Sequence, residues 1–137
     1  MKLKLNKNKS FIVAEIGWNF LGDINLAKKM ILSAKRSGAD AVKFQIWNPK
    51  NLRKGSWDKD GRRKLYEKSF LDKKKYKSLY DFSKKNNICC FASVWSSKDL
   101  KILSSVSKEI VKIPSPEAYN IDLIKEALKV FKKVVLS

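Results

Sequence analysis

Histidine is absent from this 137-residue sequence, and that absence excludes several kinds of active site. A Ser/His/Asp triad, a Cys/His dyad and a histidine-ligated metal centre each need an imidazole that the chain does not have. Neither a GxGxxG motif nor a Walker-type phosphate loop occurs among its five glycines. Chemistry in this chain therefore has to come mainly from lysines, carboxylates, amides and hydroxyls.

Cysteine is scarce, and long apolar runs are missing. The two cysteines, Cys89 and Cys90, are neighbours in a predicted strand, so their side chains point to opposite faces and are poorly placed to bond each other or to bind one metal ion. We expect buried thiols in a reducing compartment. No apolar run approaches the roughly 18 residues of a membrane span, and no signal-peptide core follows the first four residues. A cytoplasmic protein without a membrane partner is therefore expected.

Acidic residues are few, 13 against 31 lysines and arginines, and the formal net charge of +18 raises the question of an anionic polymer as partner. Half of this excess falls in residues 50–85, which hold 14 basic and 5 acidic residues. The segment has no RNA-binding signature and no zinc-finger spacing. We interpret it as a solvated, lysine-rich surface, so nucleic acid is not the expected partner.

Five apolar segments predict β-strands, and the intervals between them predict helices or turns. In the first interval, Asp23 can cap a helix whose apolar residues follow helical spacing from Leu26 to Ala34, and Gly38 can end it. Because the apolar runs are nearly continuous, the strands are predicted to be parallel and buried on both faces. The predicted strands are residues 10–17, 41–47, 88–95, 109–115 and 133–137.

Three further helices are predicted from apolar spacing and capping residues. The helix before the third strand carries four large side chains among lysines: Tyr76, Leu79, Tyr80 and Phe82. Ser96 and Ser97 can cap the next helix, whose apolar residues are Leu100, Leu103 and Val106. The last helix is marked by Ile121, Ile124, Leu128 and Phe131, which are predicted to form its core side.

This alternation of strands and helices predicts an α/β fold, and two architectures fit it. A complete (β/α)8 TIM barrel needs about 200 residues or more. Residues 1–137 would then be the N-terminal part of a barrel, with about its first five strands and four helices. The alternative is a complete small open α/β sheet, because 137 residues suffice for one domain with its own core.

Glu15 stands out because it interrupts the apolar first strand, between Ala14 and Ile16. An unpaired carboxylate buried there would cost several kcal/mol, so it needs a partner, a ligand or a raised pKa. We interpret Glu15 as an active-site acid, base or hydroxyl-binding group. The alternative is an ion-pair partner for a lysine such as Lys43.

Lysine side chains follow two different strands. Lys43 and Gln45 are two residues apart and so point to the same face, a combination suited to an anionic substrate with hydroxyl or amide groups. The sequence Lys112-Ile-Pro-Ser115-Pro-Glu117 places an ammonium, a hydroxyl and a carboxylate within six positions. Two lysines converging from different strands would form a phosphate or carboxylate site.

Other strand ends carry weaker candidates for substrate binding. Ser93 and Ser137 end the third and fifth strands, where hydroxyls can hold phosphate oxygens. Asn19, in the first loop, is either a substrate-binding residue or a turn residue. Gly22 and Asp23 are interpreted as turn and cap residues.

Taken in order, four motifs resemble the N-terminal half of the sialic acid synthase (N-acetylneuraminate synthase) family. They are Ile12-Val-Ala-Glu15-Ile-Gly17 with Asn19 and Gly22-Asp23, then Gly38-Ala-Asp-Ala-Val-Lys43-Phe-Gln45, then Lys112-Ile-Pro-Ser115-Pro-Glu117, and finally Val135-Leu-Ser137. The family usually has a histidine and an asparagine where this chain has Phe20 and Leu21.

The resemblance implies a TIM-barrel enzyme that condenses phosphoenolpyruvate with N-acetylmannosamine or a related amino sugar, giving a 2-keto-3-deoxy sugar acid and phosphate. It implies that Glu15, Gln45 and Glu117 are catalytic positions facing the sugar or the reacting carbons. The positions that hold phosphoenolpyruvate would be Lys43, Lys112, Ser115 and Ser137.

The resemblance also implies parts that this chain does not hold. In the family a divalent metal ion, manganese or magnesium, polarises the sugar aldehyde. Its two histidine ligands, the C-terminal half of the barrel and an antifreeze-like domain would lie beyond Ser137. Full-length members are expected to be homodimers, and this chain alone is expected to be inactive. The alternative function is a non-catalytic, degenerate relative that binds anionic polymers or nucleic acid through its basic surface.

Overall fold

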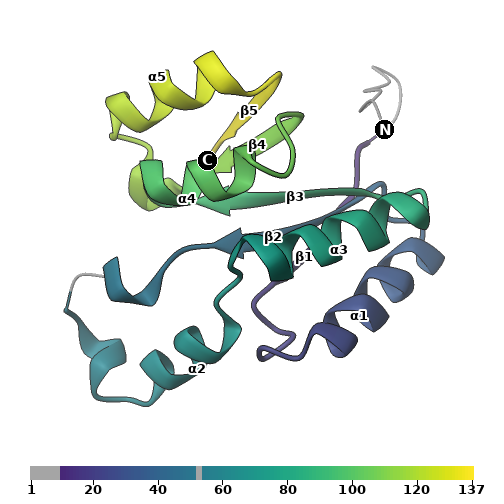
Figure 1. Cartoon of the computed structure of the whole chain (residues 1–137), viewed down its shortest axis with the longest axis horizontal. Coiled ribbons are helices and arrows are strands. Elements are labelled where there is room, and N and C mark those ends of the chain that lie inside the picture. The colour runs from purple at the N-terminus through teal and green to yellow at the C-terminus, as the bar shows by residue number, and fades with distance from the viewer. Residues whose placement is uncertain (1–9, 52–53) are drawn as a thin grey trace.

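Five parallel strands lie in the order β1-β2-β3-β4-β5, each hydrogen-bonded to the next one along the chain (Figure 1). The computed structural model describes residues 10–51 and 54–137. A strictly sequential order is that of a TIM barrel, whereas doubly wound open sheets reverse direction at an inner strand. The parallel α/β prediction is therefore confirmed, in its barrel form. The strands are β1 (Val13–Gly17), β2 (Ala41–Ile46), β3 (Cys89–Val94), β4 (Ile110–Ile113) and β5 (Lys133–Leu136).

Each predicted strand is present but is shorter than predicted, because side chains and turns end the ladder early. Before β1, the Ile12 amide donates to the Asp40 carboxylate at 2.8 Å, which ties the start of β1 to the start of β2. After β4, Pro114 has no amide hydrogen to donate to a ladder, and a short 3-10 helix, η3 (Ser115–Glu117), follows.

Four helices connect successive strands, as predicted: α1 (Ile24–Arg36), α3 (Lys73–Lys85), α4 (Ser97–Ser104) and α5 (Ile121–Val130). The predicted caps are confirmed for α1 and α4. The Asp23 carboxylate accepts from the amides of Asn25 and Leu26, and the Ser96 hydroxyl accepts from the Asp99 amide. Both satisfy amides that have no partner inside their helix.

The connection between β2 and α3 contains structure that the sequence did not predict. It holds two 3-10 helices, η1 (Pro49–Asn51) and η2 (Ser56–Asp58), and the helix α2 (Arg62–Ser69). The residue that precedes α2 is Gly61, which has a left-handed backbone conformation and no side chain to cap the helix. Within this basic helix, only Tyr66 and Ser69 are buried. Figure 1 shows α2 beyond the carboxyl ends of the strands.

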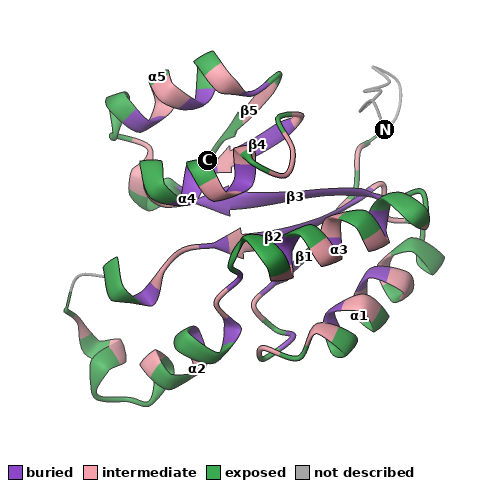
Figure 2. Ribbon diagram, in the orientation of Figure 1, coloured by how far each residue is buried: buried purple, intermediate pink, exposed green. Residues whose placement is uncertain are grey.

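The two faces of the sheet have different surroundings. On the outer face, Val42, Phe44 and Ile46 are fully buried in the main core, together with side chains of the helices. Figure 2 shows this pattern, with buried central strands and helices exposed on their far sides. The inner face carries a smaller apolar cluster: Ala41, Cys89, Phe91 and Ile110, with Phe11 and Val13 packed against it.

Two predictions about burial are wrong. Strand β5 is not buried on both faces, because Val135 and Leu136 are exposed in a strand that pairs only with β4 among the described strands. In α5 and directly after it, Ile124 and Phe131 pack on the core as predicted, but Ile121 and Leu128 are exposed, and the other core residues are Leu123 and Ala127. These two are four residues apart and so share one helix face.

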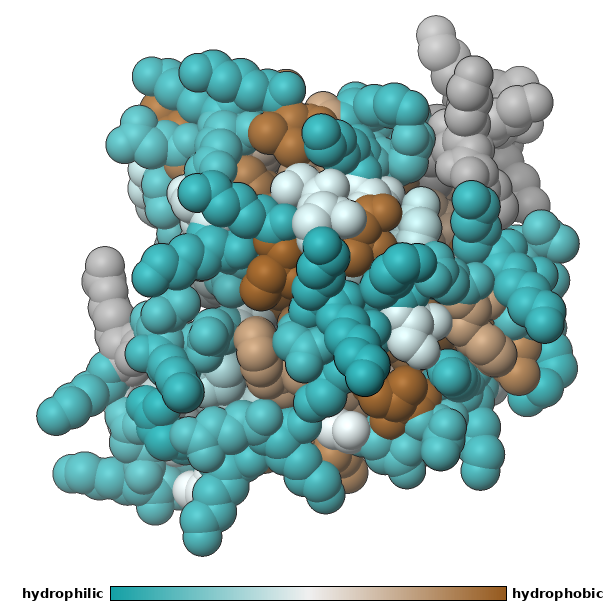
Figure 3. Space-filling view, viewed as in Figure 1, coloured by the Kyte–Doolittle hydropathy of each residue, from teal (hydrophilic) through white to brown (hydrophobic). Residues whose placement is uncertain are grey.

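Both cysteines are free and buried, as predicted. Burial raises the pKa of the Cys90 thiol to about 12, so the reactive thiolate is scarce at neutral pH. The described residues include no helix that is both long enough and apolar enough to cross a bilayer. Figure 3 shows a face of the molecule that is mostly hydrophilic, in keeping with the predicted lysine-rich surface.

A Gly22→Ala substitution is expected to lower the free energy of unfolding by about 2–4 kcal/mol. Gly22 has φ +81°, and a β-carbon there would overlap the backbone carbonyl of Lys68 in α2. Gly38 is a matched control, because its φ of +84° is equally unfavourable for alanine but no atom lies within 4 Å of the added carbon. Urea unfolding of Gly38→Ala should show a loss of only about 1 kcal/mol. Equal losses would contradict the contact with α2.

Candidate functional site

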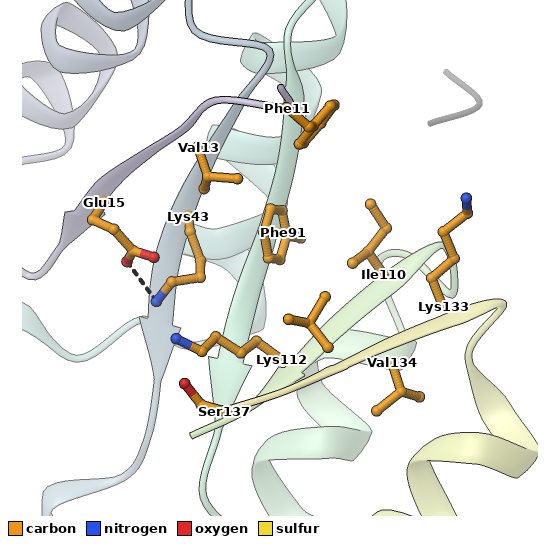
Figure 4. Close-up of a pocket in the computed structure, with 11 residues that line it drawn as sticks. Phe11, Val13, Glu15, Lys43, Phe91, Ile110, Lys112, Lys133, Val134 and Ser137 are labelled. Carbon is orange, nitrogen blue, oxygen red and sulfur yellow. Dashed lines mark ion pairs between the residues drawn. The ribbon is translucent and has the colours of Figure 1, made fainter. Parts of the chain in front are cut away.

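The inner face of the sheet forms a pocket of about 570 Å³ that contains most of the predicted anion-binding residues. We call it the lysine pocket. Figure 4 shows Glu15, Lys43, Lys112 and Ser137 toward one end, and Lys133 apart from them beside Ile110. The lining residues are Phe11, Val13, Glu15, Lys43, Phe91, Ile110, Lys112, Lys133, Val134, Val135 and Ser137.

Lys43 is the central group of the lysine pocket. Its side chain is only 3% exposed, and its amino group lies 2.7 Å from a carboxylate oxygen of Glu15. The same amino group donates to the hydroxyl of Ser93 at 2.9 Å. Glu15 and Lys43 are register partners on β1 and β2, which places the two side chains on the same face. The ion pair considered as one alternative for Glu15 is therefore present.

The charge of Lys43 is held at some energetic expense. Burial lowers the pKa of Lys43 below its ordinary value of 10.5, Glu15 opposes that shift, and the positive charge of Lys112 adds to it. Figure 4 shows the side chains of Lys43 and Lys112 reaching the same region of the pocket, with Ser137 beside them. An anion bound between the two amino groups would relieve their repulsion.

The pocket as a whole is positively charged. The amino groups of Lys43 and Lys112 lie together in it, against the one carboxylate of Glu15. The Ser137 amide donates to the Ile113 carbonyl at 3.2 Å, which continues the ladder past β5 and places this residue at the pocket. Amino groups with a hydroxyl nearby suit a phosphate or carboxylate.

A second pocket, of about 840 Å³, contains the other two predicted catalytic residues, Gln45 and Glu117. The Glu117 carboxylate accepts a hydrogen bond from the side-chain amide of Asn120 at 2.9 Å. All four tryptophans of the chain line this pocket, and we call it the tryptophan pocket. Its lining residues are Trp18, Gln45, Trp47, Asn48, Asn51, Trp57, Tyr66, Trp95, Ser96, Asp99, Pro116, Glu117, Tyr119 and Asn120.

Three predicted substrate-binding residues lie outside the linings of both pockets. Asn19 and Ser115 are exposed, and each takes part in a backbone turn: the Asn19 amide donates to the Ile16 carbonyl, and the Ser115 carbonyl accepts from the Ala118 amide. Ser93 is 1% exposed and acts as a hydrogen-bond partner of Lys43. In this structure Ser93 therefore contacts the Lys43 amino group instead of lining the pocket.

The aromatic residues of the tryptophan pocket were missed by the sequence analysis. A signal for them does exist, because Trp18, Trp47 and Trp95 each follow directly after the last residue of a strand, β1, β2 and β3 respectively. The carboxyl ends of parallel strands meet at one edge of a barrel sheet, so residues at these positions are brought together. Tyr66 had no such signal, since it comes from α2.

Asp99 was also missed. It lies in the first turn of α4, is 2% exposed and lines the tryptophan pocket. Its carboxylate accepts a hydrogen bond from the Ser96 hydroxyl at 2.7 Å. Burial raises the pKa of Asp99, and the hydrogen bond from Ser96 opposes this shift.

The residues present do not fit a metal site by themselves. Within residues 10–51 and 54–137, no group of three or more histidine, cysteine, aspartate or glutamate side chains is close enough to hold an ion. Glu15 is engaged by Lys43, and Glu117 lines the other pocket. No step of the chemistry proposed below is therefore assigned to a metal held by this chain.

Comparison with known proteins agrees with this geometry. The NeuB family matches residues 30–137. N,N'-diacetyllegionaminic acid synthase of Campylobacter jejuni is 36% identical over 140 residues, which cover 94% of this chain and 42% of that protein. Pseudaminic acid synthase of Helicobacter pylori is 34% identical over 137 residues, covering 92% of this chain and 40% of that protein. The chain thus spans about two fifths of the length of these relatives.

A solved structure supports the same assignment. The N-acetylneuraminic acid (sialic acid) synthetase of Leptospira borgpetersenii, crystallised with citrate, superimposes with a TM-score of 0.85 and 33% identity. The match covers 99% of this chain and 49% of that one. The match to this sialic acid synthetase extends over the whole five-stranded sheet and both pockets. The chain belongs to the NeuB family of sialic acid synthase-like proteins.

Proposed function

We propose that this chain forms the phosphoenolpyruvate side and part of the sugar side of a nonulosonic acid synthase. The reaction would join phosphoenolpyruvate to N-acetylmannosamine or a related amino sugar and release a 2-keto-3-deoxy sugar acid and phosphate. The observation that carries the proposal is the buried Lys43, whose amino group reaches the same region of the pocket as that of Lys112.

The lysine pocket is proposed as the site of phosphoenolpyruvate. Its phosphate and carboxylate are both anionic, and Lys43, Lys112 and Ser137 offer two amino groups and a hydroxyl. Glu15 contacts the Lys43 amino group and opposes the lowering of its pKa by burial. In this proposal Glu15 and Ser93 position the lysine, and Lys43 itself contacts the substrate.

The proposed chemistry is a carbon-carbon bond formation followed by loss of phosphate. The enol carbon of phosphoenolpyruvate attacks the aldehyde carbon of the open-chain sugar, whose oxygen takes up a proton and becomes a hydroxyl. Water adds to the resulting cationic carbon and supplies that proton. The carbon-oxygen bond to phosphate then breaks, phosphate leaves with that electron pair, and the proton of the added hydroxyl passes to the phosphate as the ketone forms. Gln45 and Glu117 line the tryptophan pocket, where Gln45 would bind the sugar and Glu117 would orient or deprotonate the water.

The chain alone is proposed to bind without turnover. It has no histidine, and the metal that the family uses would need ligands that the described residues do not assemble. Binding of phosphoenolpyruvate, and not catalysis, is therefore the property to measure on residues 1–137.

Calorimetric titration of the 137-residue chain with phosphoenolpyruvate tests the proposal. We expect binding that is lost in a Lys43→Ala, Lys112→Ala double variant. A matched control removes two lysines with the same change of charge but outside the lysine pocket, Lys29→Ala with Lys125→Ala, both of which are exposed. The control should bind like the parent chain.

Two results would contradict the proposal. One is an absence of phosphoenolpyruvate binding by a chain that circular dichroism shows to be folded. The other is equal, salt-dependent weakening in both double variants, because that would indicate a general surface charge effect. Strong salt-dependent binding of nucleic acid without phosphoenolpyruvate affinity would instead favour the degenerate, polymer-binding alternative.

A further inference from the structure

Four of the six aromatic residues that line the tryptophan pocket, Trp18, Trp47, Tyr66 and Trp95, form one connected cluster. The ring centroids of Trp18 and Tyr66 are 4.2 Å apart, and those of Trp47 and Tyr66 are 4.5 Å apart. Trp47 also lies 6.0 Å from Trp18 and 5.6 Å from Trp95. Aromatic surface on this scale at a pocket wall favours ligands with apolar groups.

The two pockets differ in charge and therefore suit different ligands. Among residues 10–51 and 54–137, no lysine or arginine lines the tryptophan pocket, whose charged residues are Asp99 and Glu117. Its other polar groups are amides such as Gln45 and Asn120. The lysine pocket therefore suits the anion, and the tryptophan pocket suits an uncharged ligand with amide or hydroxyl groups.

Polar groups in the tryptophan pocket also have unused hydrogen-bonding capacity. Among the described residues, four buried side-chain atoms have no hydrogen-bond partner, and two of them, the Trp57 indole nitrogen and one Asp99 oxygen, belong to residues that line this pocket. Unsatisfied buried atoms are rare in folded proteins and call for an explanation such as a missing ligand or water.

From these observations we infer that the tryptophan pocket determines acceptor specificity, by favouring amino sugars with apolar substituents, above all longer N-acyl chains, over sugars that offer only hydroxyl groups. The inference rests on the proposed function for the identity of the acceptor as an amino sugar. In this arrangement the aromatic cluster packs on the acyl chain, and the amide side chains bind the polar edge of the sugar. The specificity-determining residues are Trp18, Trp47, Trp95 and Tyr66.

The test is a fluorescence titration of the 137-residue chain with N-acetyl-, N-propanoyl- and N-butanoylmannosamine. All four tryptophans line the pocket, so their emission reports on this site alone. We expect affinity to rise on the order of fourfold with each added methylene. Affinity that is unchanged or falls along the series would overturn the inference.

Variants of Trp95, which contacts only Trp47 among the ring pairs of the cluster, sharpen the test. Trp95→Gln should flatten the series, whereas Trp95→Phe keeps an aromatic ring and should retain it. The control is Leu128→Gln, which changes an exposed residue of α5 away from the pocket. If Trp95→Gln retains the full trend, the inference is wrong. If circular dichroism shows that Trp95→Gln is unfolded, the acyl series with the parent chain and with Trp95→Phe decides whether the inference holds.

Phosphoenolpyruvate titrations of the same samples separate this inference from the proposed function. Trp95→Gln should bind phosphoenolpyruvate like the parent chain, because Trp95 does not line the lysine pocket. A clear acyl-chain trend without phosphoenolpyruvate binding would reject the synthase proposal and support the specificity of the pocket. Phosphoenolpyruvate binding without an acyl-chain trend would support the synthase proposal and reject the inferred specificity of the tryptophan pocket.

Discussion

A Lys43→Met substitution should weaken phosphoenolpyruvate binding by about 10-fold to 100-fold, without destabilising the fold. Lys43 is buried, and methionine has a similar length without a charge that needs a partner. The partner left behind, Glu15, is 57% exposed and can be hydrated. The free energy of unfolding should therefore stay the same or rise by up to about 2 kcal/mol. Calorimetry and urea unfolding measure the two effects.

Glu15→Gln is the counterpart of this variant and should have the opposite effect on stability. Among the described residues, it leaves the buried Lys43 amino group with the hydrogen bond to the Ser93 hydroxyl but without a carboxylate, so an uncompensated charge remains in the pocket. We expect a loss of about 1–2 kcal/mol, less than for a fully buried pair because Glu15 is largely exposed to solvent. A stable Glu15→Gln together with an unstable Lys43→Met would contradict this account of the ion pair.

The pH dependence follows from the same burial. Because the pKa of Lys43 lies below 10.5 in the folded chain, phosphoenolpyruvate affinity should begin to fall at a pH where ordinary lysines are still protonated. Between the folded and the unfolded pKa, the unfolded chain binds the extra proton, so the free energy of unfolding should rise with pH in that window. Both trends should disappear in Lys43→Met. If either trend persists in Lys43→Met, that trend must come from another lysine.

Much of this arrangement follows from local patterns in the sequence. The apolar runs locate five strands to within a few residues, and Asp23 and Ser96 mark two helix starts, because caps and strands depend on neighbouring residues. The two-residue spacing of Lys43 and Gln45 also places both on the inner face. In the structure, however, Lys43 lines the lysine pocket and Gln45 lines the tryptophan pocket, a difference that their spacing does not predict.

The features that were missed depend on contacts between distant segments. Helix α2 has a weak start at Gly61, and its one large buried residue, Tyr66, packs on Trp18 and Trp47 from other parts of the chain. The prediction for α5 was wrong at Leu128. Leu123 and Leu128 are equally apolar, and only the packing of the helix on the sheet decides which of them is buried. Such choices are made by tertiary structure and not by periodicity.

A Phe20→His substitution should destabilise this chain by about 2–4 kcal/mol. Histidine is the residue that the sialic acid synthase family usually has at this position. Phe20 is 1% exposed, and its ring packs edge-on against Phe44 at 5.9 Å in the outer core. An imidazole there would bury a polar group among apolar side chains. Below pH 6.5 the unfolded chain would also gain a proton on this histidine, so the loss should grow with acidity.

Leu21→Asn introduces the neighbouring family residue and is the matched control for Phe20→His. Leu21 is 45% exposed with φ +51°, a left-handed backbone that asparagine adopts more readily than leucine. Urea unfolding should therefore show no loss, or a gain of up to about 1 kcal/mol. Position 20 would then be part of the core in this chain, and a sugar contact could not be restored there by one substitution. A stable Phe20→His with unchanged pH dependence would show that the ring of residue 20 faces solvent or the site, and would move this loop toward the acceptor.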